Sequence, residues 1–389
     1  SLGSVPDDYS IISNSLKYSS KFTQVSYVAN KNKTENIIRL NNRTSPVFYA
    51  VRPGFPKFSA SDRHAYIAYK SKDSKASVVV DWEADPAYGN ADSFRFSPDG
   101  SRYAYRAAAT DRQCVVIDGK PDKWYTGIPM NDEDNILFSP DSKHVAYVAY
   151  KDEACKIVHD GNEGEHRFER IEALKFSSDS NSLAFKGRVE RKGEREKWCV
   201  VLNGRKHQVY DRIFSLMFSP NSQHLAYVAV KDQQMTLVLN GQEQEPHDLY
   251  GLPTFAPNSK KLAFAYRDGK DFHVVVNSDK GPAFRRIYKF YFSLDSSRFA
   301  YIGGQEDTWQ CVVDGKVGKP YKIVDSFKFS LDSNRYAYAA ATEGGNGKIV
   351  VDGIAHEEHF AIAEPYFSLD SKYIVYRARR ESDKKWATI

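Results

Sequence analysis

The chain of 389 residues is 41% hydrophobic and 27% charged, a composition that excludes a disordered polypeptide and indicates a folded protein. Its 55 basic and 50 acidic residues leave a net charge of +5, a small surplus that gives no reason to expect a nucleic-acid partner. No apolar run approaches the roughly 18 residues needed to cross a bilayer, so we expect no transmembrane segment.

The first expected strand covers residues 8–13, with the sequence DYSIIS. It resembles residues 210–215, YDRIFS, near the middle of the chain. The 25 Tyr and 23 Phe residues favour β-structure throughout, because aromatic rings pack well on pleated surfaces. Which sheet this first strand joins depends on the repeat that begins directly after it.

One phrase recurs along the chain: an aromatic residue, Ser, any residue, Asp or Asn, and then an apolar–aromatic pair. Ten copies start at Tyr18, Phe58, Phe96, Phe138, Phe176, Phe218, Phe255, Phe292, Phe329 and Phe367. Their spacing runs from 37 residues (Phe218 to Phe255) to 42 residues (Phe96 to Phe138). The first two copies are degenerate, with Lys21 in place of Asp and with Asp62 displaced by one residue. A period of this length indicates a repeat architecture.

A second phrase follows in most copies, a β-branched run that ends in Asp-Gly or Asn-Gly. The glycines of this phrase are Gly119, Gly161, Gly204, Gly241, Gly315 and Gly353. Such dipeptides favour a tight hairpin, because both central residues need a positive φ. Each repeat therefore predicts four strands, A to D, with the Ser-x-Asp phrase at the A–B corner and Asp-Gly at the C–D turn. Because a corner carboxylate accepts N–H bonds within its own turn, we expect structural roles for Asp99, Asp141, Asp179, Asp295, Asp332 and Asp370.

Four strands in about 40 residues are typical of a propeller blade, whereas helical repeats of similar length would show a 3.6-residue period. The copies FSPDGSRYAY from Phe96 and FSPDSKHVAY from Phe138 resemble the TolB-like, WD40-like (PD40) repeat family. The resemblance covers nearly the whole chain. The ten copies of the repeat predict an all-β protein, a single closed β-propeller of about ten four-stranded blades over residues 1–389, and the resemblance agrees with this fold. The resemblance also implies a bacterial interaction scaffold in the periplasm or cell envelope that binds a protein partner.

The two chain ends complement each other in the sequence. The last copy supplies strand A from Phe367, strand B over residues 373–378 and strand C over residues 385–389, but no strand D. We expect residues 8–13 to fill that place and to close one ring, because closure removes exposed sheet edges. Two five-bladed rings remain the alternative.

Histidines give no sign of a metal site in the sequence. His64, His144 and His224 all lie six residues after the aromatic residue of their copies, a place that Arg occupies in sister copies. We therefore expect them on strand surfaces rather than as ligands. His356 and His359 form the one close pair, and on a strand their spacing points them to opposite sides.

Catalytic and cofactor motifs are absent from the sequence: no G-x-S-x-G, H-E-x-x-H, P-loop or dinucleotide fingerprint occurs. We predict no catalytic residue, no metal and no cofactor. The four cysteines lie in four different repeats and are expected to be free, partly buried thiols; they are Cys114, Cys155, Cys199 and Cys311.

The B–C loops vary most between copies, and loops on a rigid scaffold are where function concentrates. We expect them in residues 70–75, 108–113, 187–197, 267–271, 303–309 and 341–347. The longest contains the candidate partner-binding residues Arg188, Arg191, Lys192, Arg195 and Lys197, and Trp309 ends another. A merely solvated loop is the plainer explanation of these charges.

Two functions follow from these predictions. The first is a monomeric, non-enzymatic scaffold that binds a protein or other macromolecular partner through the B–C and D–A loops. The second is a propeller enzyme or lectin that acts on a carbohydrate or peptide at the central channel. A glycosidase would need two carboxyl groups about 5–9.5 Å apart, and nothing in the sequence indicates such a pair.

Overall fold

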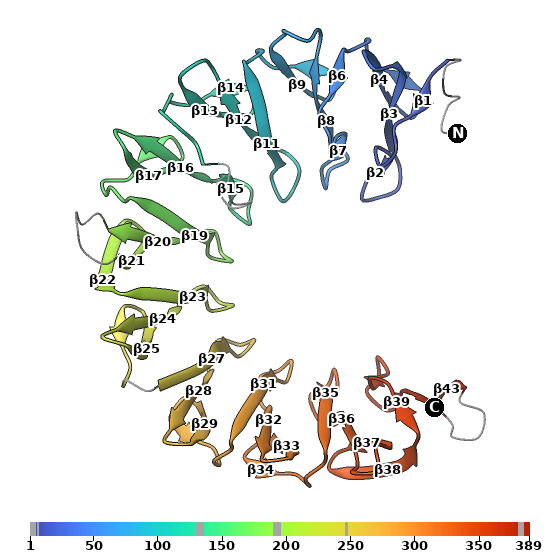
Figure 1. Ribbon diagram of the computed structural model, residues 1–389, viewed down its shortest axis with the longest axis vertical. Coiled ribbons are helices and arrows are strands. Elements are labelled where there is room, and N and C mark those ends of the chain that lie inside the picture. The colour runs from blue at the N-terminus through green and yellow to red at the C-terminus, as the bar shows by residue number, and fades with distance from the viewer. Residues whose placement is uncertain (1–4, 6–7, 130–135, 190–195, 246–247, 380–384) are drawn as a thin grey trace. The chain divides into compact units, whose positions relative to one another are not determined.

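The computed structural model describes residues 5, 8–129, 136–189, 196–245, 248–379 and 385–389. The regular structure of these residues consists of the strands β1 to β43, without a helix (Figure 1). A helix long and apolar enough for a bilayer is accordingly not found within them. The prediction of an all-β chain is confirmed.

The chain divides into two compact units, Ser1–Val209 and Tyr210–Ile389. Each unit contains a succession of antiparallel sheets in which consecutive strands are hydrogen-bonded neighbours. We call the strands of each sheet A to D in chain order. The A–B and C–D turns then lie on one side of a sheet, the turn side, and the B–C and D–A connections lie on the other, the loop side.

In the first unit, five sheets follow one another (Figure 1). The first two consist of β1 (Ser10–Ile11), β2 (Lys17–Tyr18), β3 (Val25–Asn32), β4 (Glu35–Leu40), β5 (Arg43–Thr44), β6 (Ala50–Val51), β7 (Lys57–Phe58), β8 (His64–Tyr69), β9 (Ala76–Val80) and β10 (Glu83–Ala84). The next three consist of β11 (Asn90–Phe96), β12 (Tyr103–Ala108), β13 (Gln113–Ile117), β14 (Lys120–Pro121), β15 (Ile136–Phe138), β16 (Val145–Lys151), β17 (Ala154–His159), β18 (Asn162–Glu163), β19 (Arg170–Phe176), β20 (Leu183–Val189), β21 (Lys197–Leu202) and β22 (Arg205–Tyr210).

The second unit continues the pattern with four more four-stranded sheets. These contain β23 (Arg212–Phe218), β24 (Leu225–Lys231), β25 (Gln234–Leu239), β26 (Gln242–Glu243), β27 (Asp248–Phe255), β28 (Leu262–Asp268), β29 (Asp271–Val276), β30 (Asp279–Lys280), β31 (Arg286–Phe292), β32 (Phe299–Gln305), β33 (Thr308–Val313), β34 (Lys316–Val317), β35 (Ile323–Phe329), β36 (Tyr336–Ala341), β37 (Gly347–Val351) and β38 (Ile354–His359). The last repeat contains β39 (Ala361–Ile362), β40 (Tyr366–Phe367), β41 (Ile374–Val375), β42 (Arg377–Arg379) and β43 (Trp386–Thr388). Strands A, B and C of this repeat thus form where the sequence places them.

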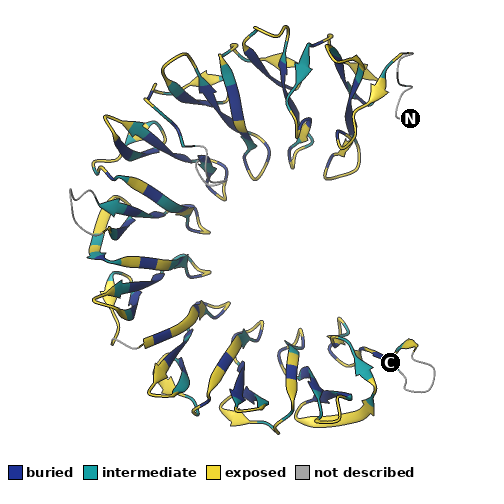
Figure 2. Cartoon of the chain, viewed as in Figure 1, coloured by how far each residue is buried: buried dark blue, intermediate teal, exposed yellow. Residues whose placement is uncertain are grey.

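The hydrophobic cores lie between neighbouring sheets. One cluster, for example, joins Val115 and Tyr125 of the third sheet to Ile136 and Tyr147 of the fourth. Strands B and C are therefore buried on both faces, which explains their nearly continuous apolar runs. In Figure 2 the buried residues lie mostly in strands, whereas the turns and the strand D β38 are largely exposed. This arrangement is that of propeller blades.

Strand A carries a β-bulge in most repeats. The register against strand B shifts between Asp92 and Arg95 and between Glu172 and Lys175, and the bulged residues Ser93 and Ala173 have φ of 55° and 53°. In the first two sheets the same irregularity separates strand A into two short pieces, β1 with β2 and β6 with β7. These two sheets correspond to the degenerate copies of the repeat.

The prediction that residues 8–13 form the missing strand D of the last repeat is wrong. Ser10 and Ile11 pair with Asn30 and Ala29 of β3, so this segment is the first half of strand A in the first sheet. Residues 386–388 pair with β42 of their own sheet. The physical reason is the bulge: residues 8–13 precede it in the first sheet just as residues 212–214 precede it in the sixth. Ring closure, the number of blades in a ring and a single domain over residues 1–389 stay predictions.

Candidate functional site

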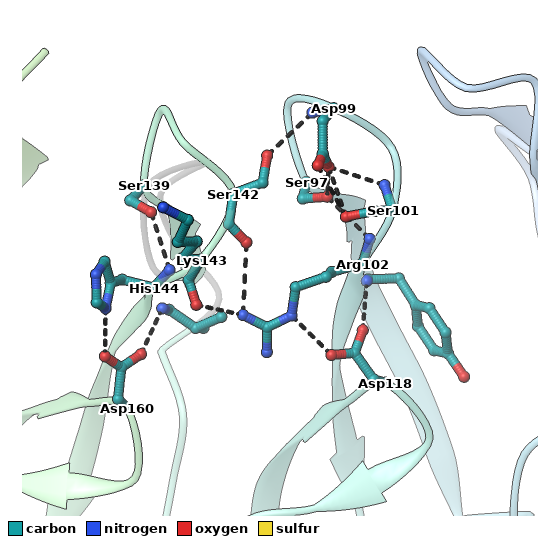
Figure 3. A network of polar contacts seen from close by, with 12 residues as sticks. Ser97, Asp99, Ser101, Arg102, Asp118, Ser139, Ser142, Lys143, His144 and Asp160 are labelled. Atoms are coloured by element: carbon teal, nitrogen blue, oxygen red, sulfur yellow. Dashed lines mark hydrogen bonds and ion pairs between the residues drawn. The ribbon is translucent and has the colours of Figure 1, made fainter. Parts of the chain in front are cut away.

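The A–B corner is built around its Asp. In the third sheet, Asp99 Oδ1 accepts hydrogen bonds from the Ser97 hydroxyl at 2.7 Å and from the Ser101 backbone N–H at 2.8 Å (Figure 3). These bonds stabilise the ionised carboxylate, so they hold the pKa of Asp99 well below its usual value. In the next copy, the Ser139 hydroxyl and the Lys143 N–H lower the pKa of Asp141 to about 2. The structural role predicted for these carboxylates is confirmed.

The same corners link neighbouring sheets. The backbone N–H of Asp99 donates to the Ser142 hydroxyl of the following sheet at 3.0 Å (Figure 3). The bond recurs from Asp141 to Ser180 in the first unit, and from Asn221 to Ser259 and Asp295 to Ser333 in the second. At these corners a periodic Ser hydroxyl therefore joins neighbouring sheets of the same unit along their turn sides.

An Arg at the start of strand B makes a second link. Arg102 Nε donates to Asp118 Oδ2 in the C–D turn at 2.8 Å, and its Nη1 reaches the Lys143 carbonyl of the next sheet (Figure 3). Arg298 repeats these contacts with Asp314 and the Asn334 carbonyl. The polar side chains of the turn sides are thus used to hold the repeats together.

The second copy shows why one expectation about histidine is wrong. Because this copy is one residue short, Arg63 and not His64 takes the place of Arg102 and pairs with Asp81 at 2.6 Å. His64 instead occupies the place of Tyr103, donating its backbone N–H to Asp81 Oδ1. It is buried against Trp82 rather than exposed on a strand surface, and this burial lowers its pKa.

The loop sides differ from the expected loops, because the strands extend further. Gly187 and Arg188 belong to β20, and Trp309 belongs to β33, where Gly304 is its partner in the ladder. The B–C connection of that sheet therefore consists of Glu306 and Asp307 alone. The expectation that Trp309 ends a loop is wrong, because β32 and β33 both extend into the predicted loop of residues 303–309.

Trp309 is packed rather than free. The Arg286 guanidinium lies 4.7 Å from the centre of its ring, and the edge of Tyr288 contacts it from the same strand as Arg286. Tyr288 itself is 61% exposed. An aromatic and cationic surface therefore exists here, with Tyr288 rather than Trp309 as its outermost part.

The basic loop of the fifth sheet is described at its two ends. Arg188 forms ion pairs with Glu169, at 2.6 Å, and with Glu196. Lys197 is half-buried at the start of β21. Arg191, Lys192 and Arg195 lie outside the described residues. The structure thus brings Arg188 together with acidic neighbours and leaves the candidate surface of this loop to be tested.

Two cross-strand ion pairs were not expected from the sequence. Arg106 of β12 pairs with Asp92 of β11 through two hydrogen bonds, and both side chains are less than one-tenth exposed. Lys186 and Glu172 repeat this pair in the fifth sheet at 2.7 Å. The sequence feature that could have revealed these pairs is a cationic residue in strand B, at a position where other copies carry Val148 or Ile302. These pairs fix the register of strands A and B beside the bulge.

The cysteines are free and buried, as expected. Burial raises the pKa of Cys114 and Cys311 to about 12 and that of Cys199 to about 11. Because the thiolate is the nucleophile, such thiols are unreactive at neutral pH. Their place is in the packing between strands.

Three grooves accompany this architecture. One of about 710 Å³ lies along the A strands of the first three sheets and is lined by Lys17, Tyr18, Lys57, Phe58, Arg95 and Phe96 among others. A second, of about 700 Å³, lies between the C–D turns of the fourth and fifth sheets, and a third, of about 590 Å³, has the equivalent place between the eighth and ninth. The sequence did not predict them, because each is formed by residues of two or three successive repeats.

His356 and His359 lie in β38, the strand D in which the sequence placed them. The one group of three metal-ligating side chains found among the described residues is elsewhere, at His144, His159 and Asp160.

No family model matches the chain, and no curated protein matches it. Similar solved structures include TolB from Acinetobacter baumannii, with 17% identity, 68% of this chain and 75% of that chain covered, and a TM-score of 0.28. The Dos1 propeller has 13% identity, coverage of 72% and 87%, and a TM-score of 0.30. The β-propeller domain of the trilobed protease from Pyrococcus furiosus has 12% identity, coverage of 69% and 96%, and a TM-score of 0.29. The strand order of this chain gives the blade architecture by itself, and membership of the TolB-like family stays a prediction.

Proposed function

We propose that this chain is a non-enzymatic β-propeller scaffold that binds a protein or other macromolecular partner through the loop sides of its sheets. One observation carries the proposal: the turn sides repeat the same corner contacts in most copies, whereas the loop sides differ. Contacts that recur from repeat to repeat stabilise the fold, whereas loops that vary on a rigid scaffold are available for recognition of a partner.

The turn sides leave few polar groups for a partner. Their Asp carboxylates, Ser hydroxyls and Arg guanidinium groups bind one another within and between sheets. A partner that used these groups would have to break the links that hold the repeats together.

The loop sides vary in both length and chemistry. Asp152–Glu153 and Glu306–Asp307 are two-residue acidic connections, whereas residues 70–75 are basic and residues 342–346 are rich in glycine. Arg188 with its acidic neighbours and Trp309 with Arg286 and Tyr288 lie at the same side of their sheets. Aromatic and Arg side chains are frequent anchors of protein interfaces.

The test places a photo-crosslinking residue at Glu306, or at Thr342, in the full chain, and at Lys316 of a C–D turn as the control. We expect crosslinks to one recurrent partner in extracts of the source organism from the loop positions alone. Equal or exclusive crosslinking from Lys316 would contradict the proposal.

A charge-reversal variant tests the candidate residues of the longest loop. Arg191→Glu, Lys192→Glu and Arg195→Glu together should weaken capture of that partner if it is acidic or polyanionic. The matched control reverses Lys120, Lys316 and Lys319, which are exposed and lie one to four residues after the Gly of a C–D turn. Recovery that is unchanged by the first variant would remove this loop from the interface.

The groove of about 710 Å³ along the A strands favours a second candidate, lectin-like binding of an anionic carbohydrate or peptide. Its lining combines aromatic rings with Lys17, Lys57 and Arg95, and the described lining residues include no carboxylate. This composition supports binding there rather than the paired-carboxylate hydrolysis of glycosidases. A glycan-array screen with the Arg95→Glu variant as its control distinguishes this function from the first.

A further inference from the structure

The fourth sheet gathers two imidazoles and a carboxylate at its turn side. His144 directly precedes β16, and His159 is the last residue of β17, where it pairs with Ala146. Because side chains alternate along a strand, His144, Ala146 and therefore His159 stand on one face of the sheet. Asp160 follows in the C–D turn. The ligand-capable atoms of the three residues all lie within 4.8 Å of one another.

The contacts converge on one oxygen atom. His144 Nδ1 lies 2.6 Å from Asp160 Oδ2, and His159 Nε2 lies 3.6 Å from the same oxygen. The other carboxylate oxygen, Oδ1, accepts the backbone N–H of Val145 at 2.9 Å. The carboxylate is thus oriented by the backbone, with Oδ2 turned toward both imidazoles.

One ring nitrogen of His159 lacks a hydrogen-bond partner among the described residues. Its Nε2 is excluded from solvent and makes no hydrogen bond within the described part of the chain. A buried polar atom without a hydrogen bond costs free energy unless something else binds it. A metal ion between His159, His144 and Asp160 would use this nitrogen.

A comparison of the copies shows that this cluster departs from the pattern of the repeat and is not a general consequence of the fold. At the place of His159, every other complete copy carries an aliphatic residue: Leu40, Val80, Ile117, Leu202, Leu239, Val276, Val313 and Val351. At the place of His144, the third, eighth and ninth copies carry Arg paired with the turn Asp. His224 of the sixth sheet has the same place as His144, but it faces Asn240 and follows the ordinary pattern with Leu239. Only in the fourth copy do two departures meet at one carboxylate.

We propose that His144, His159 and Asp160 form a binding site for a divalent transition-metal ion, of which Zn²⁺ is the best match. Two imidazole nitrogens and one carboxylate oxygen are a ligand set that Zn²⁺ accepts in tetrahedral sites, and three protein ligands leave the fourth position open. Zn–N bonds of 2.0–2.1 Å place ligand atoms about 3.3 Å apart. The imidazole of His144, now 2.6 Å from Asp160 Oδ2, would therefore move away from the carboxylate to admit the ion, which rotation of these partly exposed side chains allows.

The groove beside the site offers further ligand-capable groups, of which Glu163 already pairs with Lys151 and Lys156. His159 and Asp160 also line the groove of about 700 Å³, together with Glu163, Glu165 and His166. The equivalent groove of the second unit has Val313 at the place of His159 and is lined by Arg298, Lys316 and Lys319. The repeat thus provides the groove, and of these two grooves only the one between the fourth and fifth sheets has imidazole groups in its lining, all of them from the fourth copy. The open position of the ion would face this groove, where water can complete the coordination.

The experiment titrates the metal-free full chain with Zn²⁺ by calorimetry and with Co²⁺ by visible absorption. We expect one tight equivalent and the intense bands of tetrahedral Co²⁺. His159→Leu and Asp160→Asn introduce residues that sister copies carry at these places, so both variants should fold. Each should weaken the binding of Zn²⁺ at least about tenfold, since the loss of a group that merely orients a ligand already costs 10–100-fold.

Matched controls locate the ion. His224→Arg alters the same place in a sheet without a second histidine and should leave the affinity unchanged, as should a double variant of His356 and His359. Zn²⁺ should also raise the melting temperature of the wild type but not that of His159→Leu. The proposal is overturned if the wild type binds no more tightly than His159→Leu, if either control abolishes the tight equivalent, or if bound Co²⁺ shows only the weak bands of octahedral coordination.

Discussion

Tyr147 provides the sharpest test of how one sheet is joined to the next. Its side chain is fully buried in β16, the edge of its ring contacts Tyr125, and its hydroxyl donates to Asp122 Oδ2 at 2.8 Å. Tyr125 and Asp122 both belong to the third sheet, whereas Tyr147 belongs to the fourth. The residue therefore contributes apolar packing and a charge-assisted hydrogen bond to the same junction.

Two substitutions separate these contributions. Tyr147→Ala removes the ring from a closed site and should lower the free energy of unfolding by about 3–5 kcal/mol, the range for large aromatic residues. Tyr147→Phe keeps the ring and removes the hydroxyl, so it should cost about 1.5–3 kcal/mol, the contribution of a hydrogen bond to a charged group. Tyr103→Phe should give a similar loss, because the Tyr103 hydroxyl donates to Asp85 Oδ1 at the same distance of 2.8 Å.

Urea unfolding followed by far-UV circular dichroism measures these differences, provided that the m-values of the variants agree. Tyr373→Ala is the control, since this side chain is 68% exposed and its replacement should change stability by less than about 0.5 kcal/mol. A Tyr147→Ala variant as stable as the control would refute the packing between sheets. A Tyr147→Phe variant equal to the wild type would show that the hydroxyl contributes nothing.

Three further predictions follow from the repeat. The folded-state pKa of Asp141 lies below its unfolded value, so the stability it contributes is present above about pH 4 and is lost as the pH falls toward its folded value of about 2. Asp141→Asn, which keeps the turn as Asn221 does, should flatten that acid limb in equilibrium unfolding; an unaltered limb would exclude this carboxylate as its cause. The four thiols should resist a thiol reagent at neutral pH until the chain unfolds, because burial raises the pKa of Cys114 to about 12; fast modification of the folded chain would contradict their burial. Gly187→Ala should destabilise by about 1–3 kcal/mol, because its methyl group would overlap the Phe168 ring, whereas Gly344→Ala meets nothing closer than 4.0 Å and should be neutral in the same assay.

The sequence predicted those features that each repeat specifies by itself. The corner carboxylates, the Asp-Gly hairpins and the buried thiols depend on residues close together in the chain, and the structure confirms them. The place of residues 8–13 could not be predicted, although their resemblance to residues 210–215 was real. Both segments lead into an A strand, but the short connection between strands D and A carries no residue that marks its end. Only the hydrogen bonds of Ser10 to Asn30 resolve that ambiguity.

The grooves and the ion pairs were missed for a different reason: they depend on residues from separate strands or separate copies. Asp92 and Arg106 are 14 residues apart and meet through the register of a bulged strand. His144 and His159 meet through a hairpin in the same way. A comparison of copies at equivalent places could have found both, because a cation or an imidazole replaces an aliphatic residue there.

The repeat explains how one sheet can depart from the pattern without loss of the fold. The corner link from Asp99 to Ser142 and that from Asp141 to Ser180 hold the fourth sheet on both sides, whichever residue begins strand B. The Arg102 side chain binds both the Asp118 carboxylate and the next sheet, whereas the His144 side chain binds only the turn carboxylate of its own sheet among the contacts drawn in Figure 3. With His in place of Arg, the fourth sheet therefore lacks one contact with the next sheet, but the Ser hydroxyls still join these sheets. Because the Ser hydroxyls already join the sheets, the residue at the start of strand B can take a second role. In the fourth sheet, His144 at this place forms the proposed metal site together with His159.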